Sequence, residues 1–137
     1  MVPLGLLGVE HILKIVLAVV LGSIVGIERR SEHKPAGFRT YSLVCLGATL
    51  VSIVSIEYFG VDPARVAAGI ITGIGFLGAG AIIADRGTVH GLTTAAGLWV
   101  IAAVGLAIGA GAYLLSTVVS TVVLGILAFG RLQKNKG

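Results

Sequence analysis

Two carboxylates stand where apolar runs end, and they are the first candidates for chemistry in this chain. Glu28 closes the first apolar run and Asp85 closes the third. Mg²⁺ keeps several waters in proteins and takes one or two carboxylates as ligands. If both residues lie at one face of a membrane, they form a candidate magnesium site. The plainer alternative for each is a helix-end carboxylate beside an arginine.

A second group of candidates combines hydroxyls, a cation and an aromatic ring. Thr93 and Thr94 come early in the fourth apolar run, where their hydroxyls can bond a backbone carbonyl or a neighbouring helix. Trp99 is the single tryptophan, and we expect it to pack against glycines rather than bind a ligand. Arg39 opens the second run, and the turn predicted at Pro35 can bring it near Glu28. A solvated loop that only anchors two helices is the alternative.

The stretch GIGFLGAG at 73–80 formally matches the dinucleotide-binding pattern GxGxxG. That pattern requires an acidic residue about 20 positions further on, and residues 93–98 contain none. The surroundings are apolar, so Gly73, Gly75, Gly78 and Gly80 are expected to let another helix approach closely. There is no CxxC, no HExxH and no nucleophile–base pattern. We therefore expect no enzyme.

The composition indicates a membrane protein. Mean hydropathy is +1.05 and 12% of residues are charged, whereas about a quarter are charged in soluble domains. Five apolar runs are long enough to cross a bilayer as helices, at about 12–27, 40–59, 66–84, 92–108 and 112–129. The last two are separated only by glycines at 109–111, which permit a reversal. The expected fold is an all-α bundle of five transmembrane helices in one domain, 1–137.

The cations predict the orientation of this bundle. Because each span crosses the membrane, successive links lie on alternate sides of it. The first loop, the third link and the C-terminal tail then share one side, which carries eight of the ten Lys and Arg residues. The positive-inside rule then places the N-terminus outside and the C-terminus in the cytoplasm. If Glu10, His11 and Lys14 hold the first run at the surface, four spans remain. Because the cations lie at the ends of apolar runs, nucleic acid is not an expected partner.

Several longer motifs, in order, resemble the MgtC/SapB family of bacterial and archaeal membrane proteins. They are GIER at 26–29, KPAGFRT at 34–40, LV at 43–44 with LGA at 46–48, GIGFLGAG at 73–80, and GLTTAA at 91–96 followed by Trp99. The resemblance covers about residues 10–130. The positions it marks as functional candidates are Glu28, Arg39, Thr40, Asp85, Thr93, Thr94 and Trp99.

The resemblance implies a multi-pass protein of the cytoplasmic membrane that is linked to magnesium homeostasis and, in pathogens, to survival inside the host. For the best-known members it implies a regulator of other membrane proteins, such as ATP synthase or Mg²⁺ transporters. Two departures stand out. Tyr41 replaces the His or Asn that is more frequent in the family. The chain also stops at Gly137, before the ACT-like domain of many members, so regulation through that domain is expected to be absent.

Three functions follow as hypotheses. The leading one is a non-enzymatic modulator of membrane partners and magnesium balance, which forms a homo-oligomer through its glycine faces and needs no cofactor. The alternative is a small transporter or channel for Mg²⁺ or another cation, with a path lined by Thr93, Thr94 and glycine carbonyls. A purely structural assembly subunit is the third.

Overall fold

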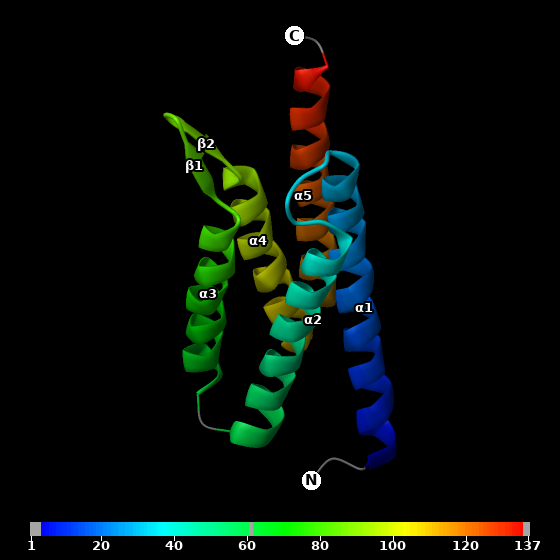
Figure 1. Ribbon diagram of the computed structural model, residues 1–137. Helices are drawn as coiled ribbons and strands as arrows, with labels where there is room; N and C mark the ends of the chain where they lie inside the picture. Colours follow the sequence, from blue (N-terminus) through cyan, green and yellow to red (C-terminus); the bar gives the residue numbers. More distant parts are fainter. Residues whose placement is uncertain (1–3, 61, 136–137) are drawn as a thin grey trace.

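Five helices form the molecule, and a short β-hairpin extends from one end (Figure 1). The computed structural model describes residues 4–60 and 62–135, but not the side chains of 4–7 and Asp85. The helices are α1 (Leu4–Ser31), α2 (Phe38–Val54), α3 (Pro63–Gly80), α4 (Leu92–Gly109) and α5 (Tyr113–Lys134). A π-helical turn, η1 (Ser55–Phe59), prolongs α2. Five helices in this part of the chain, α1 included, are long and apolar enough to span a membrane.

Helices α2 and α4 form the centre of the bundle. α2 packs along both α1 and α4, and half of the α4 span is buried, whereas 11% of the α3 span is. Glycines allow these close contacts. A side chain at Gly26 of α1 would place its Cβ 2.6 Å from the Cα of Phe38, and one at Gly105 of α4 would overlap the carbonyl of Cys45. The α1–α2 and α2–α4 interfaces are therefore backbone-to-backbone contacts.

The helix formed by the third apolar run ends at Gly80, although the sequence predicts a span that continues to residue 84. Strands β1 (Ile83–Asp85) and β2 (Thr88–His90) pair antiparallel instead, so the fold is not purely helical. Arg86 and Gly87 between them both have positive φ, 46° and 81°, as a two-residue type I′ hairpin turn requires. The hairpin returns to α4 through Gly91, where φ is 88° and a Cβ would overlap the carbonyl oxygen of Ala81.

The reversal between α4 and α5 lies at 109–111, where the sequence predicts it. Gly111 has a φ of 86°, and its N–H donates to the Ile108 carbonyl at 2.9 Å. The N–H of Ala112 donates to the Ala107 carbonyl at 2.9 Å, which satisfies another carbonyl at the helix end. α5 then runs back beside α1 and carries the C-terminus to the same end as the hairpin (Figure 1).

Candidate functional site

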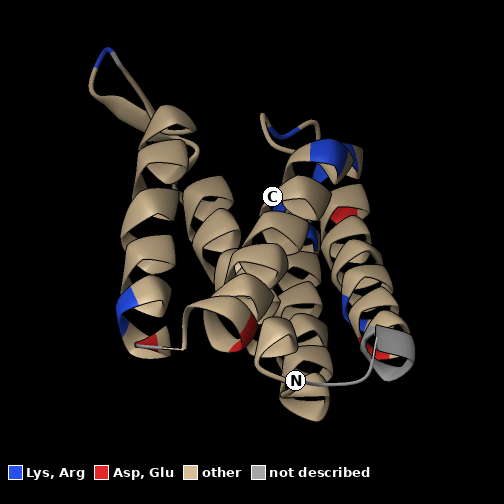
Figure 2. Ribbon diagram, turned by 90° about the horizontal axis from the view of Figure 1, so that it is seen from below, with Lys and Arg blue, Asp and Glu red and all other residues tan. Residues whose placement is uncertain are grey.

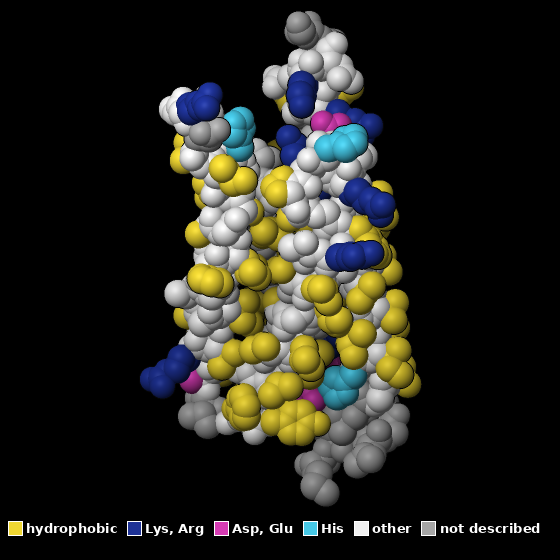
Figure 3. Space-filling model, viewed as in Figure 1, with side chains coloured by type: hydrophobic (Ala, Val, Ile, Leu, Met, Phe, Trp, Pro, Cys, Tyr) yellow, Lys and Arg dark blue, Asp and Glu magenta, His cyan; other side chains and the backbone are white. Residues whose placement is uncertain are grey.

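Positive charge gathers at one end of the bundle, which we call the basic end. It comprises the last turn of α1, the 32–37 loop, the first turn of α2, the β1–β2 hairpin and the last turns of α5. Seven of the nine Lys and Arg residues in the described part of the chain lie here: Arg29, Arg30, Lys34, Arg39, Arg86, Arg131 and Lys134. Figure 3 shows most of the dark blue side chains toward this end, and Figure 2 shows the charges seen from the opposite end. The predicted grouping of cations is therefore present in space.

Glu28 and Arg29 form a nearly buried ion pair in the last turn of α1. The guanidinium Nη2 donates to Oε1 of Glu28 at 2.9 Å, while Nε donates to Oε2. The Arg29 side chain is 4% exposed and that of Glu28 is 11% exposed. Glu28 is thus paired with its neighbour, while Arg39 lies exposed on α2.

This pairing bears on the predicted magnesium site. Both Glu28 oxygens already accept hydrogen bonds from a guanidinium, which neutralises the carboxylate that a cation would need. The side chain of Asp85, its predicted companion, lies outside the described residues. Within the described part, no cluster of three or more His, Cys, Asp or Glu side chains could hold a metal. The Glu28–Asp85 site stays a prediction.

Three hollows open at the basic end, and Lys34 lines all of them. One of about 320 Å³ lies between α1, α4 and α5 and includes Thr93 in its lining. One of about 610 Å³ lies beside the hairpin and includes Thr93 and Thr94. One of about 600 Å³ lies over the 32–37 loop and includes Arg39 and Thr40. Four of the sequence candidates thus meet around one lysine, which sequence reasoning did not single out.

Tyr41 fixes α2 to α4 immediately beneath the basic end. Its side chain is fully buried, and its hydroxyl donates to the Thr94 carbonyl at 3.2 Å. A Cβ at Gly97 would overlap the same hydroxyl, so the phenol needs a glycine opposite it. The residue at which the chain departs from the family pattern is therefore a packing contact. The carbonyl of Thr94, a predicted site residue, takes part in this contact.

Of the remaining candidates, Trp99 and three of the four glycines lie on the outward side of the bundle, and Gly78 faces α4. Trp99 is 49% exposed. A Cβ at Gly78 would lie 3.6 Å from the Ala95 Cβ of α4, whereas a Cβ at Gly73, Gly75 or Gly80 would meet open space in the described structure. The four glycines thus divide between a face on α4 and a surface that the described part of the chain does not cover. Packing of a partner against that surface stays a prediction.

A separate ionisable cluster lies at the opposite end of the bundle. Lys14 is 6% exposed and its Nζ lies 3.1 Å from a Glu10 oxygen, to which the Tyr113 hydroxyl also donates at 3.2 Å. His11 Nε2 lies 2.8 Å from an oxygen of Glu57. The sequence signal for this cluster was Lys14, a charge inside the first apolar run.

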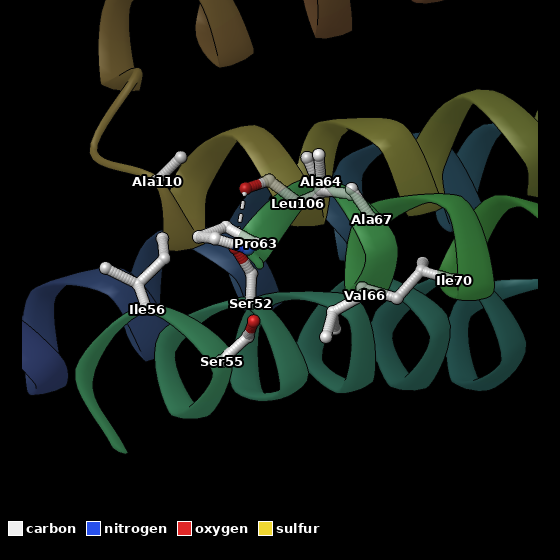
Figure 4. A pocket seen from close by; sticks show the side chains of 10 residues that line it. All are labelled: Ser52, Ser55, Ile56, Pro63, Ala64, Val66, Ala67, Ile70, Leu106 and Ala110. Atoms are coloured by element: carbon white, nitrogen blue, oxygen red, sulfur yellow. Dashed lines mark hydrogen bonds between the residues drawn. The ribbon is translucent and has the colours of Figure 1, made fainter. Parts of the chain in front are cut away.

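An apolar hollow of about 220 Å³ separates η1 from α3 and α4 (Figure 4). Ser52 donates across it to the Leu106 carbonyl at 3.1 Å. The hydroxyl of Ser55, also in the lining, is buried and has no hydrogen-bond partner in the described part of the chain. Because most lining groups are hydrocarbon, the hollow offers little to a charged ligand.

Comparison with known proteins identifies relatives. The MgtC family model matches residues 15–135. YhiD of Escherichia coli K12, named as a candidate magnesium transporter, is 40% identical over 127 residues, which cover 86% of this chain and 59% of that protein. The protein MgtC of Brucella abortus is 50% identical over 95 residues, which cover 69% of this chain and 40% of that protein.

An uncharacterised protein of Haemophilus influenzae is 41% identical over 122 residues, covering 81% of this chain and 51% of that protein. The chain thus spans about half the length of the curated relatives it matches. No solved structure matches. A family match over nearly the whole chain, together with five apolar helices, leads to one assignment: this chain belongs to the MgtC family.

Proposed function

We propose that this protein is a non-enzymatic membrane protein linked to magnesium homeostasis, which acts by modulating other membrane proteins. Its family and the name of YhiD support the link to magnesium. The MgtC/SapB resemblance supports regulation, with ATP synthase or Mg²⁺ transporters as the kind of partner. No cofactor is needed for such a role.

The pairing of the buried charges favours this proposal over ion transport. Lys14 and Arg29, the two nearly buried Lys and Arg side chains of the described chain, lie inside opposite ends of the apolar bundle. Ionisable groups within membrane spans are expensive and usually line the path of a transported ion. Each of these cations is paired with a carboxylate, Lys14 with Glu10 and Arg29 with Glu28, so these carboxylates already have a cationic partner and are poor ligands for Mg²⁺.

The hydrogen bonds of the hydroxyls inside the bundle also argue against an ion path. Thr49 donates to the Gly105 carbonyl at 2.9 Å and Ser52 donates to the Leu106 carbonyl at 3.1 Å, both across the α2–α4 interface. These oxygens already serve helix packing. A conduit would instead need several oxygens free to replace the waters of the ion.

We further propose a location and an assembly. With the basic end in the cytoplasm and the N-terminus outside, the protein obeys the positive-inside rule in the cytoplasmic membrane of a bacterium or archaeon. The uncovered glycines of α3 are the surface on which a second copy would pack. A homo-oligomer would thereby leave the basic end free for other partners.

The competing function is a small transporter or channel for Mg²⁺ or another cation. Its support is the name of YhiD and two buried hydroxyls, Ser55 and Ser120, without partners in the described chain. A path through these hydroxyls would have to avoid Lys14.

Growth of a bacterium that lacks its own MgtC-family genes tests the link to magnesium. The wild-type chain should restore growth at limiting Mg²⁺ and leave growth in abundant Mg²⁺ unchanged. A Gly105→Leu variant, which disrupts the α2–α4 contact, serves as the inactive control. Equal growth with and without the chain, at matched amounts in the membrane, would refute the magnesium role.

A further inference from the structure

The hollow between α1, α4 and α5 has a lining suited to an anion. Its polar lining consists of four cations, one carboxylate and one hydroxyl: Arg29, Lys34, Arg131, Lys134, Glu32 and Thr93. The volume of about 320 Å³ is at the lower end of the range of roughly 300–1,000 Å³ for small-molecule sites. The positive groups come from 29–34 and from 131–134, which are far apart in the sequence, so the fold itself brings them together.

Internal ion pairs leave part of this positive charge unsatisfied. Arg131 Nε forms an ion pair with Glu32 Oε1 at 3.2 Å, and Nε and Nη2 of Arg29 donate to Glu28. The other terminal nitrogen of Arg29 retains its donors. Neither Lys34 nor Lys134 has an ion-pair partner among the described residues. The hollow is therefore lined by two ammonium groups without an ion-pair partner in the described chain, and by a nearly buried guanidinium that still has N–H groups to donate.

The rest of the lining is apolar and continuous with the membrane-facing side of α5. Ile126, Leu127 and Gly130 complete it, and Ile126 is 65% exposed. Phe129, on the neighbouring turn, is 62% exposed. The acyl chain of a lipid whose head group lies in the hollow can follow these hydrocarbon groups directly, whereas a soluble anion has no apolar part to contact them.

We propose that this hollow binds a phosphate group, supplied by the head of an anionic glycerophospholipid whose acyl chains lie along α5. Arg29 and Arg131 suit phosphate oxygens through paired N–H donors, while Lys34 and Lys134 act as point charges. The Thr93 hydroxyl donates one more hydrogen bond. Basic pockets between transmembrane helices at the membrane surface are known to hold anionic head groups in this way. The site does not depend on the modulator role proposed above.

Native mass spectrometry of the detergent-purified chain tests the site. Dioleoylphosphatidylglycerol and dioleoylphosphatidylcholine are titrated separately, and inorganic phosphate is added as a soluble competitor. We expect retention of phosphatidylglycerol but not of phosphatidylcholine. If inorganic phosphate displaces the lipid at equal concentration, the phosphate site is upheld and its source is the free ion.

Charge variants separate this site from general attraction to a basic surface. Lys34→Gln and Lys134→Gln should each weaken phosphatidylglycerol binding by about fivefold, and the double variant by about thirtyfold. Lys134→Arg should retain most of the affinity. Arg86→Gln, at the hairpin tip and outside the hollow, removes the same charge from the same end and should change affinity by less than about twofold.

Two outcomes would overturn the proposal. One is equal affinity of the wild type and the Lys34→Gln/Lys134→Gln variant for phosphatidylglycerol. The other is a loss in Arg86→Gln as large as that in Lys134→Gln, which would indicate surface charge alone. Because Lys34 and Lys134 have no ion-pair partners in the described chain, these variants should fold. Circular dichroism of each variant checks that the helices are intact.

Discussion

At the scale of single residues, the Glu28–Arg29 pair has the largest electrostatic consequence. Removing Arg29 would leave an unpaired carboxylate that is 11% exposed, which is a costly state. Arg29→Gln should lower the free energy of unfolding by about 2–4 kcal/mol. This is less than the ~3–5 kcal/mol lost when one partner of a fully buried ion pair is removed, because Glu28 lies near water. Thermal unfolding in detergent, followed by circular dichroism, measures the loss.

The matched control for this prediction removes both charges. Glu28→Gln/Arg29→Gln should be more stable than Arg29→Gln alone, since no uncompensated charge remains. If the loss of stability in the double variant, relative to the wild type, equals the sum of the losses in Glu28→Gln and Arg29→Gln measured alone, the two residues are not coupled and the ion pair does not stabilise the fold.

Gly105 tests the backbone contact between α2 and α4. A Cβ at this position would overlap the Cys45 carbonyl and lie 2.9 Å from the Ala48 Cβ, and backbone cannot rotate away. Gly105→Ala should therefore cost about 1–3 kcal/mol of stability. Gly125→Ala on α5, where the space is open, should cost nothing and improve helix propensity slightly. Equal melting temperatures of the two variants would contradict the contact.

The sequence identified many of the residues at the basic end but not how they pair. Arg39, Thr40, Thr93 and Thr94 do line hollows there. Lys34 was missed as a shared residue, because only the fold brings the 32–37 loop beside both the hairpin and α5. The roles of Tyr41 and Gly97 depend on a contact over more than fifty residues, which no local pattern encodes.

At the scale of elements, hydropathy predicted the five helices but not the β1–β2 hairpin. Residues 81–84 are apolar, so they read as a continuation of α3. The end at Gly80 is instead set by the hairpin turn at Arg86 and Gly87 and by the close approach of Gly91 to Ala81. Positive φ and backbone proximity are three-dimensional properties that an apolar run does not reveal.

α3 is the element that we expect to hold a second copy. Gly69 and Gly73 are four residues apart on one face and have open space around them. Gly69→Leu and Gly73→Leu should convert the proposed oligomer to a monomer without loss of helix content, which size-exclusion chromatography with light scattering measures. Gly125→Leu on α5 is the control and should leave the oligomer intact. Unchanged mass in the α3 variants would exclude this surface.

At the scale of the whole molecule, the asymmetric charge distribution predicts the orientation in the membrane. Single cysteines can be introduced at Arg65, 87% exposed at the end away from the basic end, or at Arg86 in the hairpin, in a Cys45→Ser background. A membrane-impermeant maleimide added to intact cells should label Arg65→Cys and spare Arg86→Cys. The reverse pattern would show that the basic end faces outward.

The central claim is that this MgtC-family protein modulates other membrane proteins and does not itself conduct Mg²⁺. Mg²⁺ uptake into liposomes that contain the purified, correctly inserted chain tests it most directly, with a Mg²⁺-sensitive dye inside and protein-free liposomes as the baseline. We predict uptake no faster than the baseline for the wild type and for Glu28→Ala and Asp85→Ala. Protein-dependent uptake that is lost in either variant would contradict the claim and establish a transporter with its site at the basic end.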